Sequence, residues 1–284
     1  MIRGNRRIYS TVFKMFTVFF TAFVTLAQLS GCGGAPSTEG VVYEIAVDRS
    51  YAAVVGYEGE ASNIVIAEEY RGIPVKRINA ISGDSIKSVA IPSSVTVIGE
   101  GAFSECPFLE SIVIPDNVTK IDKNAFKYCY SLKTAVVGDG VCEMGTAVFA
   151  FCDSLESVEI GEGVTALNDD TFAWCSALKS VKLSENISRI GTSAFFNCTS
   201  LESITIPEGV SSIGESAFEW CSRLKSIVMP RSVIIVGDLA FENCSGLTDI
   251  YYKGSEEDWS EIGSAVLVSL SDGVKVHFNN IPEK

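Results

Sequence analysis

Cysteine could carry the most chemistry in this chain, because a thiol can form disulfides, bind zinc or act as a nucleophile. The 284-residue sequence has nine cysteines. Seven of them recur every 23 residues, each three positions after a phenylalanine. An interval that never changes indicates stacked identical units. The phenylalanines are Phe103, Phe126, Phe149, Phe172, Phe195, Phe218 and Phe241, and the cysteines that follow them are Cys106, Cys129, Cys152, Cys175, Cys198, Cys221 and Cys244.

This column of cysteines has a spacing that does not favour disulfides. Neighbours one repeat apart would lie about 4.8 Å from each other, but parallel side chains do not reach the disulfide dihedral angle, and an odd number cannot all pair. We therefore interpret them as small buried residues with weak S–H donors, with disulfides or redox chemistry as the alternative. No C-x-x-C pair exists, so no metal site is expected.

Catalytic motifs are absent from the sequence. The single histidine, His277, has no partner motif, and there is no P-loop, G-x-S-x-G or EF-hand sequence. The acidic clusters at Asp169-Asp170 and residues 256–258 are expected to be solvated turns and not metal sites. We predict no enzyme activity, no catalytic residues and no cofactor.

The residues between the phenylalanine and cysteine pairs predict the element that positions them. A leucine follows each phenylalanine by six residues, and two apolar residues follow at alternate positions, as in Leu201-x-x-Ile204-x-Ile206. Alternate branched residues indicate a short strand. Apolar columns such as Val210 and Ile213 form a second side, and a small residue before most phenylalanines suits a short 3₁₀ turn.

The repeat Leu201–Cys221 resembles the 23-residue leucine-rich repeat of bacterial BspA-like surface proteins, also known from treponemes. The resemblance covers about residues 70–260 and implies an α/β solenoid: a right-handed superhelix with a parallel β-sheet, short 3₁₀ or helical turns and two caps. We predict five parts: a signal peptide at 1–31, a lipidated cysteine and tether at 32–42, an N-terminal cap and degenerate repeat at 43–85, the solenoid at 86–250 and a C-terminal cap at 251–284.

The N-terminus predicts export. Four basic residues precede or enter an apolar run, and Leu29-Ser-Gly-Cys32 follows it. This tetrapeptide resembles a bacterial lipobox, which implies lipidation of Cys32 and attachment to the bacterial cell surface or outer membrane. The alternatives are an ordinary secretory signal and an uncleaved membrane helix.

The composition argues against nucleic acid as a partner. The net charge is −13, and removal of residues 1–31 would leave 18 basic and 35 acidic residues, a net charge of −17. Such a surface repels phosphate backbones.

One strand position carries charges whose sign alternates from repeat to repeat. We expect each charge to face opposite charges on both neighbouring repeats, which would fix the register. The next position is a column of serines and one threonine, suited to hydrogen bonds between repeats. The charged stripe is Lys87, Glu110, Lys133, Glu156, Lys179, Glu202 and Lys225.

Two further columns are candidate binding surfaces. The position two residues after each phenylalanine should point outward, and it holds Tyr128, Phe151, Trp174 and Trp220. The rival is the outward strand position, with Val113, Val136, Val228 and Tyr251. Exposed aromatic residues anchor interfaces, although they can also simply cover turn edges. The BspA-like resemblance implies adhesion to a host or extracellular-matrix protein; the alternatives are a glycan-binding lipoprotein and a structural envelope protein without a ligand.

Overall fold

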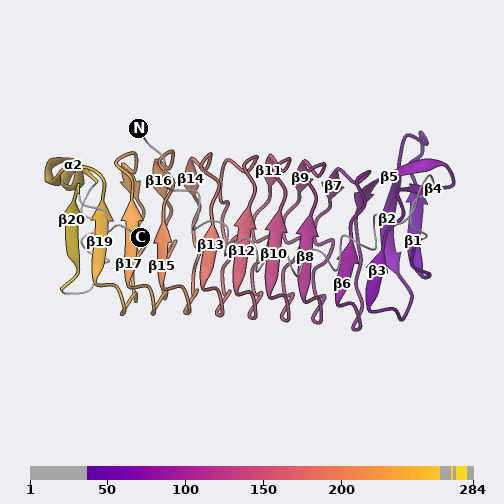
Figure 1. Cartoon of the computed structure of the whole chain (residues 1–284), viewed down its shortest axis with the longest axis horizontal. Coiled ribbons are helices and arrows are strands. Elements are labelled where there is room, and N and C mark those ends of the chain that lie inside the picture. The colour runs from indigo at the N-terminus through magenta and orange to yellow at the C-terminus, as the bar shows by residue number, and fades with distance from the viewer. Residues whose placement is uncertain (1–36, 263–269, 271–272, 280–284) are drawn as a thin grey trace, which may run out of the picture. The chain divides into compact units, whose positions relative to one another are not determined.

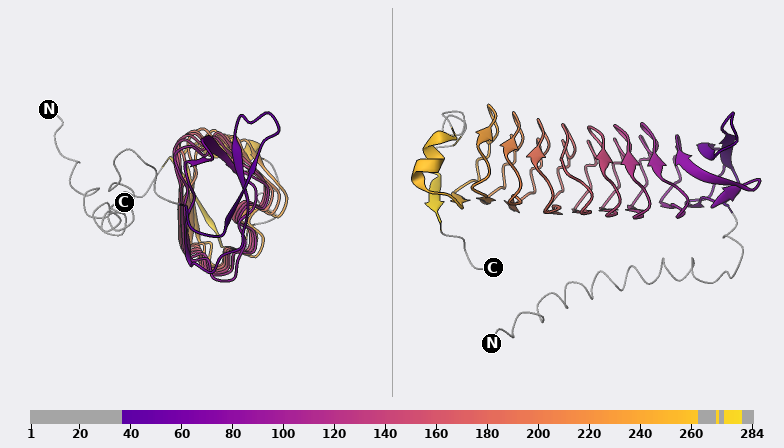
Figure 2. Two further views of the ribbon diagram at one scale, coloured as in Figure 1. Left: turned by 90° about the vertical axis from the view of Figure 1, so that its right-hand side faces the viewer. Right: turned by 90° about the horizontal axis from the view of Figure 1, so that it is seen from above.

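A computed structural model describes residues 37–262, 270 and 273–279, which fall within one compact unit, Ser37–Lys284. In this unit the chain winds into successive coils whose strands lie side by side in chain order (Figure 1). Seen end-on, the coils superimpose around a common interior (Figure 2). The predicted leucine-rich repeat solenoid is therefore confirmed.

The strands lie on two faces of the coil. The elements are β1 (Val41–Ile45), β2 (Ala52–Tyr57), β3 (Asn63–Val65), β4 (Glu69–Tyr70), β5 (Ile73–Ile78), β6 (Ser88–Ala90), β7 (Val97–Ile98), β8 (Ser111–Ile114), β9 (Lys120–Ile121), β10 (Thr134–Val137), β11 (Glu143–Met144), β12 (Ser157–Ile160), β13 (Ser180–Lys182), β14 (Arg189–Ile190), β15 (Ser203–Thr205), β16 (Ser212–Ile213), β17 (Ser226–Met229), β18 (Ile235–Val236), β19 (Asp249–Tyr252), α2 (Glu256–Glu261) and β20 (Lys275–Phe278).

The long-strand face consists of two parallel sheets, β13-β12-β10-β8-β6-β3 and β15-β17-β19-β20. The short-strand face contains β1-β2-β5-β7-β9-β11, with β4 beside β5, and then β14-β16-β18. The register follows the sequence repeat, since Ala135 pairs with Ile112 and with Val158, each 23 residues away. A one-residue slip would turn the core residues outward, so the apolar pattern fixes this register.

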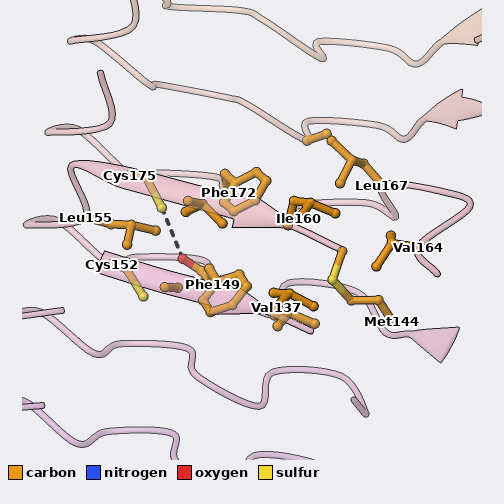
Figure 3. Close-up of a cluster of buried hydrophobic side chains, with 14 of the residues drawn as sticks. Val137, Met144, Phe149, Cys152, Leu155, Ile160, Val164, Leu167, Phe172 and Cys175 are labelled. Carbon is orange, nitrogen blue, oxygen red and sulfur yellow. Dashed lines mark hydrogen bonds between the residues drawn. The ribbon is translucent and has the colours of Figure 1, made fainter. Parts of the chain in front are cut away.

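Phenylalanine rings form the centre of the core (Figure 3). The seven rings of the repeats are fully buried, and neighbouring rings stack with centroids 5.0 to 5.8 Å apart. Around them pack the leucine and isoleucine columns, for example Leu155 and Ile160. Each coil buries its apolar face only against its neighbours, so stability is collective.

The segments that carry the phenylalanines are turns without an assigned helix, which differs from the 3₁₀ or helical geometry that we predicted. Two residues per repeat have left-handed backbone, one two positions before the phenylalanine (φ between 52° and 60°) and one two positions after it (φ between 57° and 65°). They interrupt any helix. The freed N–H groups donate to the next repeat, as Phe126 N–H does to the Val148 carbonyl at 2.9 Å.

Both ends of the described solenoid differ from the repeats. At the N-terminal end, β1 pairs antiparallel with β2. At the C-terminal end, residues 256–258, which we expected to be a turn, form the first turn of α2, where Ser255 and Asp258 make a reciprocal capping box. Trp259 of this helix packs edge-on against buried Tyr252.

Candidate functional site

The repeated cysteines lie in the core and are not joined in disulfides. Each thiol donates to a main-chain carbonyl of the preceding repeat. Cys129 donates to the Phe103 carbonyl at 3.1 Å, and Figure 3 shows the equivalent bond from Cys175 to the Phe149 carbonyl, also 3.1 Å long. Cys129 and Cys175 are both fully buried. The column therefore has a structural role in the solenoid.

Burial makes five of these thiols unreactive. It raises the pKa of Cys106 and Cys244 to about 12. It also raises the pKa of Cys152, Cys198 and Cys221 well above the usual value. A thiol held in its protonated form is a poor nucleophile.

Cys142 belongs to a different column, on the short-strand face. Its thiol lies 3.4 Å from the Thr119 carbonyl. In the equivalent position of other repeats, hydroxyls make the same bond to the preceding repeat, for example Thr119 to the Thr96 carbonyl and Ser211 to the Ser188 carbonyl. Cys142 therefore stands in for a serine or threonine.

The serine and threonine column that we predicted for bonding between repeats lies on the long-strand face. Among its described members, only Ser88 makes a side-chain hydrogen bond, and that bond goes to Asn63. The prediction of a hydroxyl ladder at this column was wrong, and the short-strand face carries such bonds instead.

The charged stripe has the predicted order of residues, but its ion pairs form between separate couples of one lysine and one glutamate. Lys179 bonds Glu156 at 2.7 Å, Lys225 bonds Glu202 at 2.8 Å, and Lys87 lies 3.9 Å from Glu110. Lys133 forms no ion pair with any residue that the structure describes. The expected alternation is present, since the Glu156 N–H bonds the Lys133 carbonyl and the Lys179 N–H bonds the Glu156 carbonyl. Each ammonium contacts at most one carboxylate of the stripe, because the two carboxylates beside it lie about two strand spacings apart.

The predicted positions on the long-strand face do not form one apolar surface. Val113, on β8, is 45% exposed, and half-buried Val136 lies beside it on β10. Half-buried Val228 and Tyr251 pair on β17 and β19, where the Tyr251 ring stacks on His277 at 4.7 Å. Between these two parts, the same position holds the ion pair of Glu159 and Lys182.

The other predicted column points outward because of its left-handed backbone. Trp174 and Trp220 are 43% and 47% exposed, while Tyr128 and Phe151 are half-buried. Trp220 contacts no other aromatic ring among the described residues, whereas the other three lie on consecutive repeats.

Five aromatic side chains form a continuous surface that we call the aromatic band. Its centroid separations are 6.0 Å from Tyr130 to Tyr128, 5.0 Å from Tyr128 to Phe151, 5.8 Å from Phe151 to Trp174 and 5.7 Å from Trp174 to Phe196. Lys127 places its ammonium 4.9 Å from the Tyr128 ring centroid and 5.6 Å from that of Phe151. The sequence analysis missed Tyr130 and Phe196, which lie outside the column but beside it in space.

A hollow of about 270 Å³ opens beside the aromatic band. Three buried alanines, Ala147, Ala150 and Ala173, are among the residues that line it. Phe151, Trp174 and Phe196 also line the hollow, together with Lys127, Asp170 and Ser193. Partial burial raises the pKa of Asp170, and the charge of Asp169 adds to this shift.

The charged side chains that line a second depression are all paired. Arg77 bonds Asp122 at 3.1 Å, and Lys120 bridges Asp122 and Glu143 at 3.3 and 3.2 Å. Its polar groups already satisfy one another, so we assign it a structural role. Within the described ranges, no cluster of three or more histidine, cysteine or acidic residues could hold a metal ion.

Comparison with known proteins places the chain in a family. The sequence profile of the BspA type leucine rich repeat region matches residues 76–187 and 142–271, so the chain belongs to this family. Leucine-rich repeat proteins of this type are typically binding proteins without catalytic activity. No curated protein matches the sequence.

Solved structures include proteins similar to this chain. The Treponema pallidum leucine rich repeat protein has the same fold and is 26% identical, with a TM-score of 0.54 over 75% of this chain and 90% of that one. A leucine-rich repeat protein from Bacteroides ovatus is 24% identical, with a TM-score of 0.41 over 76% and 70%. A leucine rich cell surface protein from Faecalibacterium prausnitzii is 20% identical, with a TM-score of 0.35 over 82% and 99%.

The predicted lipidation site, Cys32, lies outside the described residues. In the part of the chain that the structure does describe, no helix has the length and apolar character needed to cross a membrane.

Proposed function

We propose that this chain is a lipid-anchored protein of the bacterial cell surface that binds an extracellular macromolecule and catalyses nothing. The family membership and the lipobox-like Leu29–Cys32 support the location. The primary candidate is a host or extracellular-matrix protein, as the BspA-like resemblance implies. A glycan is the second candidate, and the hollow beside the aromatic band favours it.

The aromatic band is the observation that carries the binding proposal. Half-buried and exposed aromatic rings that contact one another over successive repeats form an apolar surface without a partner in the described chain. Aromatic residues dominate the energetics of interfaces. The long-strand face is the weaker candidate because the Glu159 and Lys182 pair divides its apolar residues.

The proposal is tested with the purified full-length chain on immobilised collagen, laminin and mucin, by surface plasmon resonance. We expect Trp174→Ala to weaken binding about tenfold or more, since hot-spot truncations cost over about 1.4 kcal/mol.

Trp220→Ala is the matched control. Trp220 has the same column position, a φ of 63° against 65° for Trp174, and similar exposure, but it lies outside the aromatic band. If wild type and Trp174→Ala have equal affinity for every probe that binds, the aromatic band is not the binding surface. Loss of binding in Val113→Asp alone would assign the long-strand face instead.

A further inference from the structure

The hollow beside the aromatic band exists because of two small residues in one column. The position directly after each core phenylalanine holds Lys127 and Phe196 in two repeats and Ala150 and Ala173 in the two between them. Large side chains therefore flank two alanines that are 1% and 4% exposed. The 270 Å³ hollow is smaller than the roughly 300 to 1,000 Å³ of typical drug-sized sites. It is suited to one small ring.

Three aromatic side chains are among those that line the hollow. The ring planes of Phe151 and Trp174 lie 7° apart, and the Phe196 ring is inclined 54° to that of Trp174. An apolar wall of this kind packs against the C–H face of a saturated ring, and the dispersion contacts and the removal of water favour the contact.

Three polar side chains also line the hollow. Within the described chain, the Lys127 ammonium, the Asp170 carboxylate and the Ser193 hydroxyl make no side-chain hydrogen bond or ion pair. Lys127 can only donate, the ionised Asp170 can only accept, and Ser193 can do either. Groups of both kinds thus remain available to a ligand.

The opposite charges of Lys127 and Asp170 restrict what the hollow accepts. A cationic ligand would meet the ammonium, and an anionic ligand would meet the carboxylate. A purely apolar side chain would remove water from both charges without replacing their hydrogen bonds, which is unfavourable. A neutral ring with several hydroxyls can donate to Asp170 and accept from Lys127 at the same time.

We propose that this hollow binds one neutral pyranose ring of a glycan, with its C–H face against Trp174 and its hydroxyls on Asp170, Lys127 and Ser193. This inference rests on the proposed binding role of the aromatic band, and it develops the second candidate ligand, a glycan. A peptide side chain in the hollow is the outcome that would contradict it.

The experiment uses saturation-transfer NMR and calorimetry with the full chain and the methyl glycosides of glucose, galactose and N-acetylglucosamine. Glucuronic acid and methylammonium serve as charged probes. We expect saturation transfer to ring protons of at least one neutral glycoside, and no comparable signal for the charged probes.

Two variants fill the hollow without replacing any aromatic residue. Ala173→Glu introduces the residue that Glu219 provides at the same position, and Ala150→Lys introduces the residue that Lys127 provides there. Both variants should abolish the glycoside signal. Because the two introduced side chains have opposite charges, loss of the signal in both shows that the filled volume, and not the charge, is the cause. Trp220→Ala should retain the glycoside signal.

Two results separate the inference from the function on which it rests. If Trp174→Ala abolishes binding to an immobilised protein but no neutral glycoside binds or competes, the aromatic band stands and the pyranose site is wrong. If glycosides bind equally to wild type, Ala173→Glu and Ala150→Lys, the hollow is not their site and the inference is also wrong.

Discussion

At the scale of single residues, the buried thiols are hydrogen-bond donors between repeats. Cys198 donates to the Phe172 carbonyl at 3.2 Å and Cys244 to the Phe218 carbonyl at 3.0 Å. A thiol is small enough for the space beside the phenylalanine ring and loses less on burial than a hydroxyl, since it is a weaker donor to water. The column therefore combines packing with satisfaction of a buried carbonyl.

The first prediction concerns the pH dependence of stability. Burial raises the pKa of Cys106 and Cys244 from 9.0 to about 12. Between these values the unfolded state loses protons that the folded state keeps, so the stabilisation is complete below about pH 9 and falls as the pH rises toward 12. Each such thiol should lower the free energy of unfolding by about 1.4 kcal/mol per pH unit in this window.

Urea unfolding of wild type and the Cys106→Ala/Cys244→Ala variant between pH 8.5 and 10.5 measures this effect. Lysine and tyrosine titration affects both proteins, so the difference between their slopes isolates the two thiols. The variant should be less stable at pH 8.5 and should lose stability more slowly as the pH rises. Identical slopes would contradict the assignment.

Residue types could reveal the left-handed positions, but only in some repeats. Asn124, Asp170 and Asn243 have side chains that tolerate positive φ, and Gly101 is free to adopt it. At Phe151 and Trp174 the same conformation is imposed by the neighbouring coils, whose carbonyls accept the N–H groups of these residues. At these positions the contacts with neighbouring coils override the backbone preference of the residue type. The sequence therefore predicted a 3₁₀ turn where the structure has turns interrupted by left-handed residues.

At the scale of elements, the strands were predictable and the hollow was not. Alternating apolar residues such as Ile112 and Ile114 define a strand directly. The hollow depends on Ala150 and Ala173 lying on the same side of the turn as Trp174, which follows only from the turn's geometry. The alanines are visible in the sequence, but their column alone does not show which way it faces.

The second prediction concerns the charged stripe on the long-strand face. Lys179 donates to Glu156, and this hydrogen bond, with the attraction of the same ammonium, lowers the pKa of Glu156. Glu156→Lys would place three lysines on adjacent repeats. We expect the thermal unfolding midpoint to fall by about 1 to 3 °C at low salt, and less at high salt, because exposed charges are screened.

Glu185→Lys is the control for this change. It alters the net charge equally, but residue 185 lies in a column between Glu162 and Glu208, where a lysine meets acids. Its midpoint should stay the same or rise. If Glu156→Lys leaves the midpoint unchanged at low salt, the stripe contributes nothing to register.

At the scale of the whole molecule, the stability of the solenoid depends on contacts between stacked repeats and not on the proposed lipid anchor. Each described repeat bonds and packs against its neighbours, and the first strand begins at Val41. The proposed lipid site precedes this strand by nine residues and includes none of the core. Anchoring and folding should therefore be separable.

The third prediction tests that separation with Cys32→Ser. The variant should move from the membrane or detergent phase to the aqueous phase and lose palmitate labelling, because a hydroxyl cannot take the place of the lipidated thiol. Its unfolding midpoint should match that of wild type, since the core is unchanged. Cys142→Ser is the control, because it removes the other cysteine outside the repeated column and should leave the protein membrane-bound and labelled. Retention of Cys32→Ser in the detergent phase, or an unmodified mature N-terminus in wild type, would show that the chain is held at the surface by other means.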